Sequence, residues 1–165
     1  MNFKNGILAI DVGSGTQDIL VWRSGQRIEN CPKLILPSPT TIIGRRVKEA
    51  TKRGHHLFLS GHTMGGGASS KAVREHISAG FRVMALEKPA LTFHDNIEKV
   101  VAMGIEIVDQ KPSVEPLTQL EMGDLDLSAI AQALQLFHEP IPDTVAVAVQ
   151  DHGFSPDISN RVFRF

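Results

Sequence analysis

The feature that most constrains this chain is a glycine-rich turn between two apolar runs near its N-terminus. The first run, residues 6–10, is followed directly by Asp11-Val-Gly-Ser-Gly-Thr16. A second apolar run, residues 19–22, leaves the turn. Short apolar runs bounded by turn residues are typical of buried strands. The pattern therefore predicts two strands joined by a hairpin.

The residue types in this turn are suited to binding phosphate. Gly13 and Gly15 allow left-handed torsion angles and let backbone N–H groups approach a ligand closely. Ser14 and Thr16 add hydroxyl donors, and Asp11 can hold a hydrated divalent cation. We expect a phosphate-binding hairpin in which Asp11 is the metal ligand. A hairpin turn without a ligand is the alternative.

The same segment, from Asp11 to Asp18, resembles the first phosphate loop of the actin, sugar-kinase and heat-shock-chaperone ATPase superfamily. The resemblance implies an α/β, ribonuclease H-like domain. Its mixed sheet would start with an antiparallel three-strand meander and carry helices on both faces. The resemblance also implies Mg²⁺ and ATP as cofactors. Asp18 would brace the hairpin.

Four further segments resemble an uncharacterised prokaryotic family, some of whose members are labelled pyruvate formate-lyase-activating enzymes. These segments are residues 36–40, 59–67, 92–95 and 103–105. The label implies radical chemistry at an iron–sulfur cluster, which needs several closely spaced thiolates. The chain has one cysteine, Cys31. We therefore reject the radical activity for this chain and expect no iron–sulfur cluster.

Composition narrows the class of protein. The chain has 165 residues, 42% of them hydrophobic, and a formal net charge of −1. Such a balance is ordinary for a globular domain and gives no electrostatic reason to expect nucleic acid or a membrane surface as partner. One cysteine fits a reducing compartment, and the N-terminal apolar run is too short for a signal peptide. We expect a soluble cytoplasmic protein.

Strands and helices alternate along the rest of the chain. A third strand of the meander is expected at residues 33–36. Thr92 and Asp95 fit a capping box at the start of the helix expected at 92–103. The segment containing Pro112 and Pro116 is predicted to be a loop, and Asp126 to cap an amphipathic helix with a buried apolar stripe at 127–137. Helices are also expected at 40–53 and 70–79, and strands at 57–59, 82–86, 105–108 and 144–149.

A second glycine-rich segment, Gly65-Gly66-Gly67, lies between the strand expected at 57–59 and the helix expected at 70–79. Strand, glycine-rich loop and helix is an arrangement in which backbone amides converge on an anion. We therefore expect Gly65, Gly66 and Gly67 to contact phosphate. A closely packed turn without a ligand is the alternative.

The strand expected at 144–149 is rich in small and β-branched residues, which suit burial on both faces. It leads to Asp151 and His152. Ligands of open α/β sheets gather at the carboxyl ends of strands, so Asp151 is our candidate catalytic base and His152 the second candidate. Alternatively, both side chains shape a turn through hydrogen bonds.

The sequence thus predicts one ribonuclease H-like domain over residues 1–153, with 154–165 as a tail or the start of a missing second half. Actin-like ATPases hold nucleotide between two related halves. The expected function is therefore Mg²⁺-dependent nucleotide or phosphate binding, as half of an ATPase or ATP-dependent phosphotransferase that is completed by a second half-domain or a homodimer. The expected partner is a nucleotide or a phosphorylated small molecule. Two alternatives stay open: a non-catalytic module that binds a metabolite or a partner, and a metal-dependent hydrolase.

Overall fold

The computed structural model describes residues 6–149, which fall into two compact units. Unit 1 contains residues 6–38 and 125–149, and unit 2 contains residues 39–124. Unit 1 has a mixed sheet and unit 2 a parallel sheet, each accompanied by helices. The predicted α/β class is therefore confirmed. The single domain over 1–153 stays a prediction.

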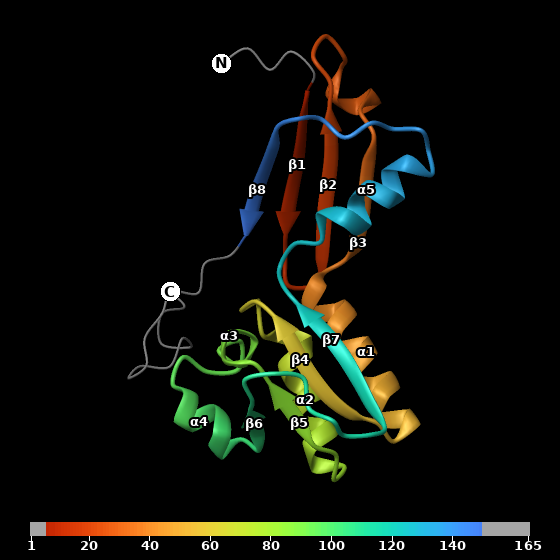
Figure 1. Ribbon diagram of the computed structural model, residues 1–165. Helices are drawn as coiled ribbons and strands as arrows, with labels where there is room; N and C mark the ends of the chain where they lie inside the picture. The colour runs from red at the N-terminus through yellow and green to blue at the C-terminus, as the bar shows by residue number, and fades with distance from the viewer. Residues whose placement is uncertain (1–5, 150–165) are drawn as a thin grey trace. The chain divides into compact units, whose positions relative to one another are not determined.

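The sheet of unit 1 is built on the predicted meander. Strands β1 (Ile7–Val12), β2 (Thr16–Trp22) and β3 (Lys33–Pro37) pair antiparallel, and β8 (Val145–Val149) pairs parallel with β1. The strand order is β3-β2-β1-β8 (Figure 1). A short 3₁₀ helix, Ile28–Asn30, lies between β2 and β3. The mixed sheet and its antiparallel start agree with the sequence analysis.

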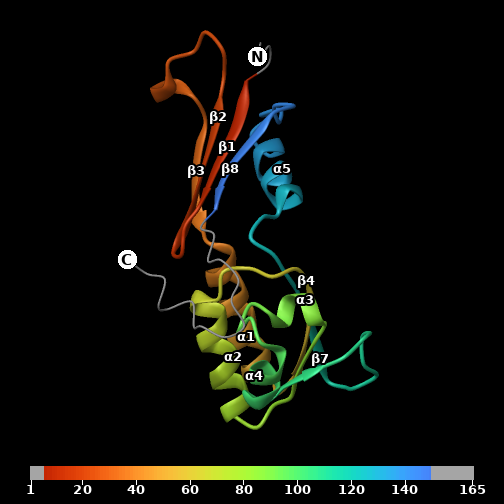
Figure 2. The ribbon, with the colours of Figure 1, turned by 90° about the vertical axis from the view of Figure 1, so that its left-hand side faces the viewer.

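Helix α5 (Leu127–Gln135) packs on one face of this sheet (Figure 2). Its buried Ile130 and Leu134 join a core cluster with the alternate residues Leu8, Ile10, Val12, Ile19 and Val21 of β1 and β2. The period-2 alternation of these strands places that set on one face. Asp126 caps the helix as predicted, because its Oδ1 accepts from the Ala129 N–H at 2.9 Å.

The opposite face of the sheet is open among the described residues of unit 1. All five residues of β8 are exposed, so the expectation that this strand is buried on both faces was wrong. Its position at the sheet edge, beyond β1, is the reason. The apolar stripe of α5 was also only partly right, since Leu127 is 42% and Phe137 is 71% exposed.

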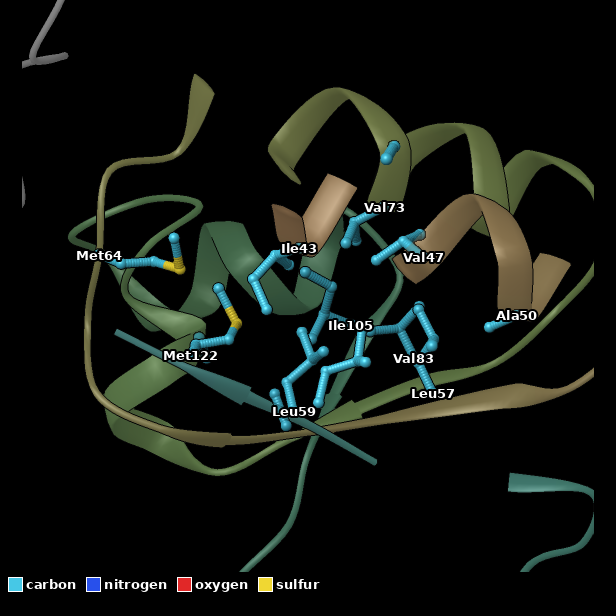
Figure 3. Packing of buried hydrophobic residues seen from close by; sticks show 14 of the residues in the cluster. Ile43, Val47, Ala50, Leu57, Leu59, Met64, Val73, Val83, Ile105 and Met122 are labelled. Atoms are coloured by element: carbon cyan, nitrogen blue, oxygen red, sulfur yellow. The ribbon is translucent and has the colours of Figure 1, made fainter. Parts of the chain in front are cut away.

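Unit 2 contains a parallel sheet of β4 (His56–Gly61), β5 (Val83–Ala85), β6 (Ile105–Ile107) and β7 (Leu117–Met122), in the order β6-β5-β4-β7. Helices α1 (Pro39–Arg53) and α2 (Gly67–Ser78) contribute Ile43, Val47 and Val73 to its core, where they meet Leu57, Leu59 and Val83 of the strands (Figure 3). Two short helices, α3 (Glu87–Ala90) and α4 (Ile97–Ala102), complete the unit.

Two local predictions for unit 2 were wrong. Strand β7 occupies part of the expected proline-containing loop, and it pairs with β4 along its whole length. Helix α4 starts later than expected, because the side chain of Asn96 accepts hydrogen bonds from the N–H groups of Glu98 and Lys99. The hydroxyl of Thr92, the expected cap, instead accepts from the Met64 N–H. Within residues 6–149, no helix combines the length and the apolar character needed to span a bilayer.

The core of unit 2 holds one fully buried histidine, His76. The Thr51 hydroxyl donates to the Val47 carbonyl at 2.9 Å, so it must accept the 2.7 Å hydrogen bond from His76 Nδ1. His76 is then the neutral Nδ1–H tautomer, stacked on Phe81, and its Nε2 has no partner among the described residues. Burial is the largest effect on the pKa of His76 and lowers it below its ordinary 6.5, while the nearby polar backbone of Arg82 raises it by less and His56 lowers it further.

We predict that unit 2 loses stability as the pH falls below 6.5. The unfolded chain binds a proton there that folded His76 binds less readily, so acid favours the unfolded state. Urea unfolding followed by NMR signals of unit 2, at about pH 7.5 and about pH 5.5, measures the difference. His76→Leu should reduce this pH dependence, whereas His62→Leu, at an exposed position, should not. Equal pH dependence in the wild type and His76→Leu would contradict the assignment.

Candidate phosphate and metal site

The β1–β2 turn is held from behind by Ser38. The Gly13 N–H donates to the Thr16 carbonyl at 2.9 Å and closes the turn. The buried Ser38 donates its N–H to the Gly15 carbonyl at 3.0 Å and its hydroxyl to the Ser14 carbonyl at 2.9 Å. These bonds fix both carbonyls of the turn on the side of Ser38.

The backbone N–H groups of the turn are exposed to solvent. Residues Gly13 to Thr16 are all exposed. Within the part of the chain that the structure describes, the N–H groups of Ser14 and Gly15 have no hydrogen-bond acceptor. Two neighbouring backbone donors at an exposed turn are a suitable start for an anion site.

The glycines of this turn do not adopt the torsion angles that we expected. Neither Gly13 nor Gly15 has a positive φ, so the left-handed explanation was wrong. A Cβ at Gly13 would lie 3.0 Å from the Thr16 carbonyl oxygen, which makes this position tight. A Cβ at Gly15 would meet no atom within 4 Å. The described fold therefore gives no reason for a glycine at 15.

Two carboxylates lie beside the turn. Asp11 and Asp18 are within β1 and β2, not in the loop, and they are direct cross-strand partners. Both are exposed. The Thr16 hydroxyl donates to Asp18 Oδ2 at 3.3 Å. Like charges directly opposite each other destabilise a strand pair, and a bound cation would remove that repulsion.

The second glycine-rich segment belongs to unit 2 and is bound by the chain itself. The Gly65 N–H donates to Asp124 Oδ1 at 2.9 Å. The Gly66 carbonyl accepts from the hydroxyls of Thr40 at 2.9 Å and Ser69 at 2.6 Å, both of them buried residues. These contacts join the start of α2 to α1 and to the end of β7.

Gly67 has a structural reason to be glycine. It is the first residue of α2, its φ is +31°, and a Cβ there would lie 3.1 Å from the Thr40 side chain. Close packing of α1 and α2 thus accounts for the glycine, which favours the closely packed turn that the sequence left open. Phosphate contact by Gly65, Gly66 and Gly67 stays a prediction.

The candidate catalytic residues Asp151 and His152 lie outside the described residues. Within 6–149, no group of three or more histidine, cysteine, aspartate or glutamate side chains is arranged to hold a metal ion. The Asp11–Asp18 pair is therefore the arrangement that we consider for Mg²⁺, with water as the remaining ligands.

Sequence reasoning missed Ser38 and Asp124, and it gave Asp18 only a bracing role. Ser38 follows the predicted third strand, and its contact with the turn depends on β3 pairing with β2. The Asp18 position could have been found from the strand alternation, since residues equally far from a two-residue turn face each other.

The comparisons with known proteins agree with the second resemblance. The fold and site define an α/β protein with an exposed turn and a carboxylate pair at the edge of that turn. The family model described as "Putative pyruvate format-lyase activating enzyme (DUF1786)" matches residues 64–165, and the chain belongs to this family. No curated protein and no solved structure matches the chain.

Alanine substitution should destabilise the second glycine-rich segment but leave the stability of the first almost unchanged. Gly67→Ala is expected to cost about 1–3 kcal/mol, because both the positive φ and the contact with Thr40 oppose a side chain. Gly15→Ala should leave the free energy of unfolding within about 0.5 kcal/mol of the wild type. Urea unfolding, followed by Trp22 fluorescence for unit 1 and by NMR for unit 2, measures both. A large loss for Gly15→Ala would show that the turn itself requires glycine.

Proposed function

We propose that unit 1 binds the phosphates of a Mg²⁺-nucleotide, or of another phosphorylated small molecule, at the β1–β2 turn. The observation that carries the proposal is the direct opposition of Asp11 and Asp18 beside a turn in which, among residues 6–149, the N–H groups of Ser14 and Gly15 have no acceptor. Like charges directly opposite each other on two strands are unfavourable, and neighbouring backbone amides at an exposed turn suit an anion. Together they match a Mg²⁺–phosphate complex.

Each residue has a distinct part in this proposal. Asp11 holds hydrated Mg²⁺, which usually keeps several waters and takes only one or two carboxylates from a protein. Gly13, Ser14, Gly15 and Thr16 surround the phosphate with amides and hydroxyls. Gly15 is where a phosphate oxygen comes closest, because an open position occupied by glycine leaves the backbone uncovered.

The proposed class is half of an actin-like ATPase or ATP-dependent phosphotransferase with a ribonuclease H-like fold. The antiparallel meander followed by a parallel strand beside β1 supports it. Asp151 is the proposed base and His152 the second candidate. A second half-domain or a second copy of the chain would complete the nucleotide site.

The activity in the family description is not part of this proposal. A radical activating enzyme needs an iron–sulfur cluster held by several thiolates. The chain carries one cysteine, Cys31, which is buried in unit 1 with its Sγ 3.6 Å from the Arg27 carbonyl oxygen. The residues of this chain therefore do not fit the cluster.

Asp11→Asn tests the proposal through two opposite effects. Removing one of two facing charges should raise the stability of the Mg²⁺-free protein by about 0.2–1 kcal/mol. The same change should weaken Mg²⁺-ATP binding by about tenfold or more, since a charged metal ligand is lost. Trp22 fluorescence during urea unfolding and calorimetric titration give the two values.

Glu29→Gln is the matched control, because it removes one exposed carboxylate of unit 1 away from the turn. It should change neither quantity. Unchanged Mg²⁺-ATP affinity in Asp11→Asn would remove Asp11 from the metal role. Binding that never depends on Mg²⁺ would instead favour a non-catalytic binding module.

A further inference from the structure

The open face of the unit 1 sheet contains a groove that adjoins the Asp11–Asp18 pair. Its volume is about 500 Å³, within the usual range for small-molecule sites. Both carboxylates line it. The groove and the proposed metal site are therefore continuous on one face of one unit.

Strand register shows what the groove presents. Ala148, Asp11, Asp18 and Ile35 are aligned across the four strands, and the next row away from the turn contains Ala146, Ala9, Leu20 and Lys33. The short side chains of the three alanines form the deepest part of the groove, while the side chains of Leu20 and Ile35 are larger. Ile35 is 71% exposed, so an occupant would remove substantial apolar surface from water.

The chemistry of the lining limits what can bind. Asp11, Asp18 and Lys33 are charged, and the other lining residues are alanine, isoleucine, leucine or valine. None carries a neutral hydrogen-bonding side chain, and the backbones of the two central strands, β1 and β2, are paired on both sides. The groove can bury an apolar body, but it has no amide or hydroxyl side chain that distinguishes one nucleobase from another.

The uncovered β1–β8 strand pair and the charge of Lys33 favour the binding of a ligand on this face. Parallel strand pairs are normally covered on both faces, yet the parallel pair β1–β8 leaves Val145, Val147 and Val149 at least 40% exposed on one side and small alanines on the other. Lys33 brings a positive charge to the groove, which complements an anionic ligand.

We infer that the ligand of this site is a phosphate ester with an apolar body, which lies in the groove while its phosphates lie at the turn. The inference rests on the proposed function and adds the substrate class. Affinity should follow the apolar area of the body and should depend little on the identity of a base.

Calorimetric titration with Mg²⁺ and four probes tests this inference: pyrophosphate, ATP, GTP and geranyl diphosphate. Geranyl diphosphate should bind about tenfold or more tightly than pyrophosphate, since it adds apolar burial to the same diphosphate group. ATP and GTP should agree within about threefold, because no lining side chain reads the base.

Two variants locate the effect in the groove. Ile35→Ser should reduce the affinity for geranyl diphosphate relative to pyrophosphate, without changing the affinity for pyrophosphate. Ala148→Leu, which places a larger side chain in the groove, should have the same effect. Ile28→Ser is the matched control, because Ile28 is 51% exposed and does not line the groove. Trp22 fluorescence verifies that each variant is folded.

The outcomes separate this inference from the proposed function. Equal affinity for pyrophosphate and geranyl diphosphate would overturn the inference and leave the phosphate site standing. A strong preference between ATP and GTP, or an equal effect of Ile28→Ser and Ile35→Ser, would also overturn it. Absence of Mg²⁺-dependent binding for every probe would overturn both.

Discussion

The register of the β1–β2 hairpin is the constraint on which the account of unit 1 depends. Pairing from Ile7↔Trp22 to Val12↔Gln17 sends one set of apolar residues toward α5 and the other set to the open face. The same register places Asp11 opposite Asp18. A slip by one residue would exchange the faces, burying the carboxylates under α5 and exposing the core. Core packing and the proposed metal site therefore depend on the same backbone hydrogen bonds.

Much of the fold could be predicted because its signals are local. The meander, α1 and the cap at Asp126 follow from apolar runs, helical spacing and a capping residue. Strand β7 was missed because prolines precede it, although Thr118, Leu120 and Met122 alternate as a strand should. The division into two units could not be predicted, since strand order depends on contacts between distant segments.

The sequence indicated which residue types form the candidate site, but not the torsion angles or the surroundings of its turn. Glycines at 13 and 15 indicated a special turn, but the torsion angles differ from expectation, and the open environment of Gly15 became visible only with the strands in place. Sequence alone also could not separate the two glycine-rich segments. Ser38 leaves the amides of the first segment exposed, whereas Asp124 binds the Gly65 amide of the second. A ligand that uses Gly65 would have to displace this carboxylate.

The central claim is that the Asp11–Asp18 pair and the β1–β2 turn together form a Mg²⁺–phosphate site. Calorimetric titration of ATP into the wild-type chain, with and without Mg²⁺, tests it most directly. The account predicts binding with Mg²⁺ that is weakened when Mg²⁺ is removed, because the phosphates would then face two carboxylates without a cation between them. Equal binding in both conditions, or no binding in either, would contradict it.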